Sequence, residues 1–303
     1  MSMLIASSLD DALAALAAGA RPVAGGSDLV VGARHGKAPL PASLVAIDRI
    51  AELRNVTESA DGGLVVGAGV SHHVIEHHPV IGARFSGLAD ASALVGSPST
   101  RNVGTIGGNV MNASPAMDTG APLVVLGASV ELRSASASRT VAITDLWTGP
   151  GRTVAAADEL CVAVHLPAPA ARSGSAYVRL EYRRAMEIAV VGAGASVTLD
   201  DSGAIASVAV ALTAVAPTII AVTDLGSLTG SSVADAAAAV AAAASEQARP
   251  ISDLRASDRY RRHTVGVMAR RAVEAAARRA AGETIAVPVN RALGIGAASG
   301  AAS

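Results

Sequence analysis

The spacing of apolar and polar residues predicts short helices and strands at the start of the chain. Residues 7–19 begin with serines that can cap a helix, carry acidic residues in the first turn and end at a glycine, so they predict a helix. Apolar runs at 21–26 and 43–48 predict two strands, and the sequence after Gly26 predicts a short helix between them. Residues 1–55 are therefore predicted to form a small α/β unit.

The middle of the chain alternates between apolar segments and one long polar stretch. Residues 64–71 predict a buried strand, and two helical patterns follow between 71 and 96. Residues 99–122 are rich in glycine and polar side chains and lack periodicity, which predicts a functional loop. Strand patterns return at 123–134 and 159–167.

The last part of the chain predicts a separate domain. Residues 167–175 are rich in Pro, Ser and Gly, which indicates a domain boundary. Two apolar strands then flank a turn at 200–203, and helical patterns cover 232–246 and 258–281. The small residues after Arg291 predict a frayed tail.

Composition narrows the class of protein. Hydrophobic residues make up 51% of the 303 residues and charged residues 16%, which is enough apolar material for a sizeable core. A net charge of −1 argues against nucleic-acid binding. The single cysteine, Cys161, excludes a disulfide framework, a cysteine-ligated zinc finger and a self-contained iron–sulfur cluster.

The sequence also predicts a cytoplasmic protein. Its longest alanine-rich apolar stretch, 234–244, is much shorter than the ~20 residues that a membrane span needs. The first twenty residues lack the basic segment of a signal peptide and contain Asp10 and Asp11.

Two glycine-rich loops are the main candidates for ligand binding. The first runs from Ala24 to Asp28, between a predicted strand and helix, and the second runs from Thr105 to Asn109. Glycines let the backbone approach an anion closely, and a helix N-terminus adds a favourable dipole. Two such loops indicate one ligand with two phosphates, and the alternative is a pair of ordinary tight turns.

Other candidate motifs are weaker. The Rossmann pattern fails, because Gly67-Ala68-Gly69 and Gly192-Ala193-Gly194 both lack the third glycine. The lysine of a P-loop is missing, and no catalytic Ser/His/Asp grouping is recognisable. Cys161 lies in an apolar strand, which predicts an unreactive thiol.

Four histidines between residues 72 and 78 raise the question of a metal site. His73 and His77 would share one helical face, but Glu76 is expected on a different face and a third ligand would have to come from elsewhere. The histidines are therefore interpreted as the polar surface of a helix, and no metal is predicted.

A charged cluster follows the predicted domain boundary and contains Arg179, Tyr182, Arg183, Arg184 and Glu187. Its arginines could contact a flavin or phosphate edge, and the alternative is a hinge between domains held by salt bridges.

These motifs together resemble one family, the FAD-binding (medium) subunits of the molybdenum hydroxylases of the xanthine dehydrogenase and carbon monoxide dehydrogenase type. The similarity extends from about residue 20 to 285. The matching segments are VAGGSDLVVGARHGK, STRNVGTIGGNVMNASPAMDTGAPLVVLGASVEL, TGPGRT, EYRRAMEIAVVGAGA and PISDLRASDRYRRH.

The resemblance implies an α+β fold with two domains. A PCMH-type (vanillyl-alcohol-oxidase-like) FAD-binding domain would occupy residues 1–170, with lobes at about 1–55 and 56–170. A small α+β C-terminal domain would occupy 175–285, and 286–303 would be a flexible tail.

The resemblance also implies which residues bind FAD. The two loops would hold its pyrophosphate, Asp118 would bind a hydroxyl-bearing part of FAD, and a strand with Leu160 and Cys161 would line the flavin. The family often has Lys at the position of Arg179, and often Asp at that of Glu187. The FAD-binding residues implied are Pro22, Val23, Ala24, Gly25, Gly26, Ser27, Asp28, Leu29, Gly104, Thr105, Ile106, Gly107, Gly108, Asn109, Asp118, Leu160, Cys161 and Arg179.

The resemblance implies that the chain transfers electrons and that none of its own residues is catalytic. A small subunit with [2Fe–2S] clusters and a large subunit with the molybdenum cofactor would be the partners, in a hetero-hexamer with two copies of each chain. Electrons would pass from the clusters through FAD to an external acceptor. Two alternatives are a stand-alone flavin enzyme similar to UDP-N-acetylenolpyruvoylglucosamine reductase and a non-catalytic flavin-binding protein.

Overall fold

The structure is a computed structural model that describes residues 1–36 and 39–295. The chain divides into two compact units, each assembled from three segments. The first unit contains residues 1–74, 98–114 and 127–168. The second contains 75–97, 115–126 and the chain from Pro169 onward.

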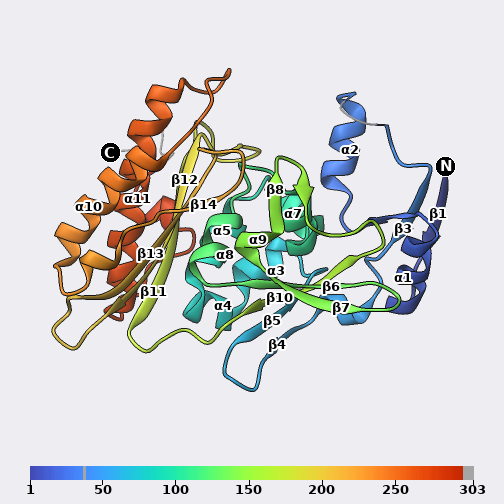
Figure 1. The fold of residues 1–303 in the computed structure, drawn as a ribbon, viewed down its shortest axis with the longest axis horizontal. Coiled ribbons are helices and arrows are strands. Elements are labelled where there is room, and N and C mark those ends of the chain that lie inside the picture. The colour runs from blue at the N-terminus through green and yellow to red at the C-terminus, as the bar shows by residue number, and fades with distance from the viewer. Residues whose placement is uncertain (37–38, 296–303) are drawn as a thin grey trace, which may run out of the picture. The chain divides into compact units, whose positions relative to one another are not determined.

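Parallel and antiparallel sheets make up the first unit (Figure 1). Its N-terminal sheet has the order β1-β3-β2 and is parallel, and helix α1 and strand β10 share an apolar core with it. The antiparallel sheet has the order β4-β5-β10-β6-β7. The strands are β1 (Ser2–Ile5), β2 (Arg21–Val23), β3 (Ser43–Ala46), β4 (Val56–Glu58), β5 (Leu64–Gly67), β6 (Ser129–Arg133), β7 (Ser138–Ala142), β8 (Trp147–Gly149), β9 (Arg152–Thr153) and β10 (Leu160–Leu166).

Short helices connect these strands. They are α1 (Leu9–Ala17), α2 (Ser27–Arg34), the 3-10 helix η1 (Ala51–Arg54), α6 (Pro98–Val103), α7 (Ile106–Asn112) and α9 (Ile143–Leu146). Ser8 caps α1 as predicted, and its hydroxyl accepts the N–H of Asp11 at 3.1 Å. Helix α3 (His72–His77) continues from the first unit into the second.

The second unit is built on a four-stranded antiparallel sheet (Figure 1). Its strands, in spatial order, are β11 (Ser173–Leu180), β12 (Val191–Leu199), β13 (Ile205–Thr213) and β14 (Ile220–Ala221). The helices are α4 (Pro79–Arg84), α5 (Ser86–Leu94), α8 (Gly120–Val125), η2 (Gly226–Leu228), α10 (Val233–Gln247), α11 (Asp258–Ala280) and α12 (Val289–Ala292).

Small residues let helices approach both faces of this sheet. On β12, Ala193 and Ala195 belong to the core that includes α11. Gly192 and Gly194 face the other way, and a Cβ on Gly194 would lie 2.8 Å from the backbone of Ala121 in α8. The glycine pair that fails the Rossmann pattern therefore serves close backbone packing.

Two predictions about secondary structure are wrong. The predicted loop at 99–122 contains helix α7, most of α6 and the start of α8, and the predicted strand at 123–134 begins only at Ser129. Helices this short span less than two turns, so their periodicity is not visible in the sequence. The predicted strands around the turn at 200–203 and the two long helices are confirmed.

The predicted tail at 286–303 is only partly described. Its residues 289–292 form α12, in which Val289 and Asn290 are buried. Residues 296–303 of the predicted tail lie outside the described residues.

Candidate functional site

The first glycine loop leads directly from strand β2 into helix α2. Pro22 and Val23 end the strand, and Gly26 occupies the N-cap position with φ of 67°, a left-handed conformation that favours glycine. No side chain caps α2 at this position. The first N–H groups of a helix have no partner within the helix, so a helix start of this kind can bind an anion.

The remaining residues of the first loop surround that terminus. Gly25 and Asp28 are exposed, and Ala24, Ser27 and Leu29 are half-buried. Asp28 lies in the first turn of α2.

The backbone donors of the second glycine loop are paired with acceptors in the loop and in the segment 68–70. Thr105 is the N-cap of α7, and its hydroxyl accepts the N–H of Gly108 at 3.1 Å. The N–H groups of Ile106 and Gly107 donate to Val70 and Ala68 at 3.0 and 2.9 Å. Asn109 donates to the Thr105 carbonyl at 2.9 Å. This loop therefore presents a fixed surface rather than a set of open donors.

The two loops, separated by about eighty residues in sequence, lie against each other in the first unit. A Cβ placed on Gly25 would be 1.8 Å from the carbonyl oxygen of Val103 and 3.0 Å from the nitrogen of Gly104. A Cβ on Gly104 would lie 3.9 Å from the Ser27 hydroxyl. Only a glycine at position 25 permits this approach, so the structure brings together the two loops that the sequence singled out.

A buried histidine supports the second loop and was not predicted. His72 is 1% exposed, and its backbone N–H donates to the Gly104 carbonyl at 3.0 Å. Burial, together with the positive charge of Arg101, lowers the pKa of His72 to about 4. The interpretation of His72 as a surface residue is wrong, because the ring lies under the loop and not on the solvent face of α3.

Leu160 and Cys161 lie on strand β10 of the first unit, and both are buried. Leu160 belongs to the core shared with α1, as does Val162. Burial raises the pKa of the Cys161 thiol to about 12, which keeps it protonated.

Asp118 and Arg179 form a buried ion pair in the second unit. Arg179 Nη1 lies 2.7 Å from Asp118 Oδ2, and the Tyr177 hydroxyl donates to Asp118 Oδ1 at 2.8 Å. Glu181 forms a second ion pair with this guanidinium, in which Arg179 Nη2 lies 2.8 Å from Glu181 Oε2. Burial raises the pKa of Asp118, while the Arg179 charge acts in the opposite direction. Both oxygens of the predicted FAD-binding carboxylate therefore have partners within the protein.

A second buried ion pair of this unit was also not predicted. Arg279 holds Asp90 with two contacts of 2.6 and 3.0 Å, and Asp90 also accepts the N–H groups of Tyr177 and Val289. These contacts of Asp90 link α5 to α11 and β11. Neither residue stands in a recognisable motif, so no signal in one sequence could have paired them.

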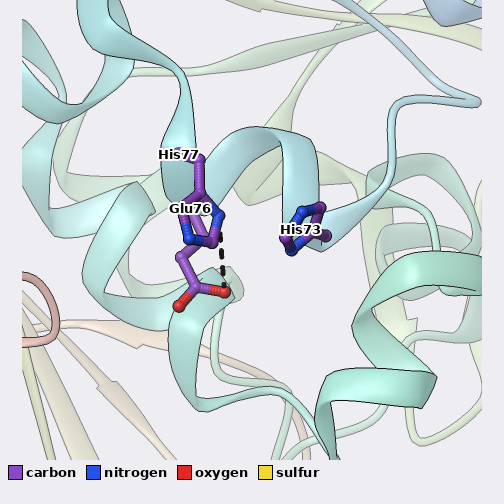
Figure 2. A group of neighbouring side chains, drawn as sticks. All are labelled: His73, Glu76 and His77. Atoms are coloured by element: carbon purple, nitrogen blue, oxygen red, sulfur yellow. Dashed lines mark ion pairs between the residues drawn. The ribbon is translucent and has the colours of Figure 1, made fainter.

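Helix α3 carries a possible metal-binding group, shown in Figure 2. One ligand atom from each of His73, Glu76 and His77 lies within 4.8 Å of the others. Glu76 Oε2 is 4.0 Å from His77 Nδ1, so the expectation that Glu76 lies on a different face is wrong. His73 lies three residues before Glu76 and four before His77, so on the helix it is a neighbour of both. The absence of a metal stays a prediction, which a zinc titration would test.

Comparisons with known proteins match both parts of the chain. A family described as the FAD binding domain in molybdopterin dehydrogenase covers residues 1–169. A family described as the CO dehydrogenase flavoprotein C-terminal domain covers residues 176–276.

Relatives and solved structures agree with these families. The carbon monoxide dehydrogenase medium chain of Afipia carboxidovorans is 33% identical over 86% of this chain and 90% of its own length. The xanthine dehydrogenase FAD-binding subunit of Escherichia coli O157:H7 is 32% identical over 65% of this chain and 68% of its own length. A chain of the reconstituted CO dehydrogenase of Oligotropha carboxidovorans has a TM-score of 0.86 and 32% identity, covering 92% of this chain and 98% of that chain.

The chain belongs to the family of FAD-binding medium subunits of molybdopterin dehydrogenases. It is an oxidoreductase component, and the predicted α+β fold with an FAD-binding domain followed by a small C-terminal domain is confirmed. The match of residues 176–276 argues against the reductase alternative. Among the described residues, no helix combines the length and apolar character that crossing a membrane requires.

Proposed function

We propose that this chain holds FAD in a molybdenum-containing hydroxylase or dehydrogenase and passes electrons from partner [2Fe–2S] clusters to an external acceptor. Bound FAD would supply the redox chemistry, which no side chain provides. The family match and the medium-chain relatives support the assignment. The single cysteine supports the division of labour, because one thiol cannot ligate a cluster.

The observation that carries the proposal is the contact between the two glycine loops. The uncapped start of α2 would receive the FAD pyrophosphate through backbone N–H groups. The exposed backbone of Gly108 would form the facing wall. Leu160 and Cys161 would line the flavin, and Asp118 and Arg179 would act near it, as the resemblance implies. The chain would bind and orient the cofactor, and no residue of its own would touch the organic substrate.

The proposed partners are a small iron–sulfur subunit and a large subunit with the molybdenum cofactor. We propose a hetero-hexamer with two copies of each chain, located in the cytoplasm. The large subunit would bind and hydroxylate the organic substrate.

The test is purification of the chain with and without its partner subunits, followed by FAD, iron and molybdenum analysis. We expect FAD in both preparations, and iron and molybdenum only in the complex. Neither loop contains a histidine that could tether the flavin, so acid denaturation should release FAD from the polypeptide. Full dehydrogenase activity of an iron-free and molybdenum-free chain would contradict the proposal.

A further inference from the structure

Helix α3 presents two histidines to solvent on one side and packs its other side into the protein. His72 and Ile75 are buried, at 1% and 0% exposure. His73 and His77 are exposed, and they lie four residues apart, so they are neighbours on the outer side of the helix. Two histidines at this spacing on one helical face form the zinc-binding pair of several metalloproteases.

Glu76 supplies a third donor atom to this pair. One ligand atom from each of His73, Glu76 and His77 lies within 4.8 Å of the others, and Glu76 Oε2 is 4.0 Å from His77 Nδ1. Figure 2 shows the Glu76 carboxylate turned toward the His77 ring on the same helix. Two donors that each lie about 2.1 Å from a tetrahedral ion are about 3.4 Å apart. Side-chain rotation alone would therefore bring these atoms into coordination, without a change in the backbone.

The backbone that carries these side chains is fixed at both ends. The Ser71 hydroxyl accepts the N–H of Val74 at 3.3 Å in the first turn of α3. The N–H of His78 donates to the Ile75 carbonyl at 3.4 Å, and Pro79 then begins helix α4. Ligands on a packed backbone lose less conformational freedom when they bind an ion than ligands on a flexible segment do.

The donor set favours a transition-metal ion. Two imidazole nitrogens and one carboxylate oxygen suit zinc and chemically similar divalent ions, whereas magnesium and calcium take oxygen ligands. Zinc enzymes with two histidines and one glutamate keep a fourth position for water. The His77 side chain is 61% exposed and the Glu76 side chain 12%, so an ion can approach from solvent on the histidine side while the carboxylate is partly shielded.

We propose that His73, Glu76 and His77 bind one divalent transition-metal ion of the zinc type, with water in the remaining position. This proposal replaces the prediction that no metal binds here, because that prediction placed Glu76 on a different face of the helix. The site uses none of the residues implied in FAD binding, and it is separate from the metal centres proposed for the partner subunits. It therefore does not rest on the proposed function.

The test is calorimetric titration of the full chain with zinc chloride, after purification without a polyhistidine tag and removal of metals with EDTA. We expect one zinc ion per chain. His73→Gln and His77→Gln should each weaken zinc binding at least about 10-fold, since even residues outside the ligand set are worth 10–100-fold in metal affinity. Titration with magnesium chloride should give no binding.

Two further variants define the ligand set. Glu76→Gln keeps the size of the side chain but removes the carboxylate, and it should also weaken zinc binding. His263→Gln removes an exposed histidine of α11 outside the group, and it should bind zinc like the wild type. Wild-type zinc affinity in Glu76→Gln would overturn the three-residue site.

Melting temperature provides a second measurement that does not depend on calorimetry. An ion that binds the folded chain raises its melting temperature, so zinc should raise that of the wild type and of His263→Gln but not that of His77→Gln. In EDTA all variants should melt like the wild type and keep its FAD content. A wild-type chain that binds no zinc, or binds it equally well in His73→Gln and His77→Gln, would overturn the metal site and leave the proposed FAD function unaffected.

Discussion

The two glycine loops have similar sequences but use their backbone groups differently. The loop at Ala24–Asp28 begins a helix whose N-cap residue, Gly26, provides no capping side chain. The loop at Thr105–Asn109 also begins a helix, yet Thr105 caps it and the N–H groups of Ile106 and Gly107 bond to neighbouring carbonyls.

This difference shows that a glycine loop is not by itself an anion site. In the first loop, Gly26 gives a left-handed N-cap without a capping side chain. In the second, Gly107 permits close packing, since a Cβ there would lie 2.5 Å from the Cβ of Ala68. Under the proposed function, we expect the first loop to contribute more to phosphate recognition and the second to shape the site.

The largest expected effect comes from Gly25→Ala, which separates the two loops. The new Cβ would lie 1.8 Å from the Val103 carbonyl oxygen, so backbone must move. We expect the free energy of unfolding to fall by about 3 kcal/mol or more, with loss of FAD. Urea denaturation and FAD content measure the two effects. Gly32→Ala, in the helix α2 that follows this loop, is the control, because nothing lies within 4 Å of its Cβ position.

The second prediction concerns His72 beneath the Thr105 loop. Its pKa is about 4 in the folded protein and near the ordinary value of 6.5 when unfolded, so the unfolded chain binds the extra proton. Stability should therefore fall as pH decreases from about 6.5 to 4, by up to about 3 kcal/mol from this group. Urea denaturation across this range measures how the free energy of unfolding changes with pH. His72→Gln should reduce this dependence, and the control His73→Gln, at an exposed position, should leave it unchanged. An equal slope in wild type and His72→Gln would contradict the prediction.

Gly108→Val tests whether the second loop forms a wall of the FAD site. The Cβ position at Gly108 has only the Thr105 hydroxyl nearby, at 3.1 Å, so the fold should tolerate the change. We expect FAD affinity to decrease by about 2 kcal/mol from lost contact and clash. Fluorescence titration with FAD measures it. Gly107→Ala should instead reduce the stability of the fold. A folded Gly108→Val variant with normal FAD affinity would show that Gly108 does not line the FAD site.

The smallest expected effect is that of Thr105→Ala, which removes the cap of α7. Loss of the hydroxyl leaves the Gly108 N–H without its acceptor, and we expect stability to fall by about 1 kcal/mol. The freed N–H would make the second loop more like the first. FAD affinity and thermal melting should therefore be measured together, with Thr105→Ser, which keeps a hydroxyl, as control. A stability loss equal in Thr105→Ser and Thr105→Ala would rule out the capping role.

Motifs that depend on neighbours in sequence could be predicted. The cap at Ser8, the strands around the turn at 200–203 and the two long helices follow from local residue patterns. The resemblance of whole segments also gave the family, which the comparisons confirm. The absence of a catalytic residue in this chain stays a prediction.

Contacts between distant residues could not be predicted. One sequence shows Arg179 in a charged cluster, and only the fold shows that its guanidinium is buried between Asp118 and Glu181. The same holds for Asp90 and Arg279, which are 189 residues apart. Ion pairing depends on distance in space, and charge alone does not reveal the partner.

The sequence by itself determined the family, the two glycine loops and the absence of enough cysteines for a cluster, because these depend on residue identity and short spacing. Only the tertiary structure decided that Gly25 lies against Val103, that the second loop donates hydrogen bonds to the segment 68–70 and that His72 is buried. Each of these facts depends on which backbone atoms meet after folding. Steric exclusion and hydrogen-bond pairing act over a few ångströms, so they are fixed by three-dimensional neighbours and not by neighbours along the chain.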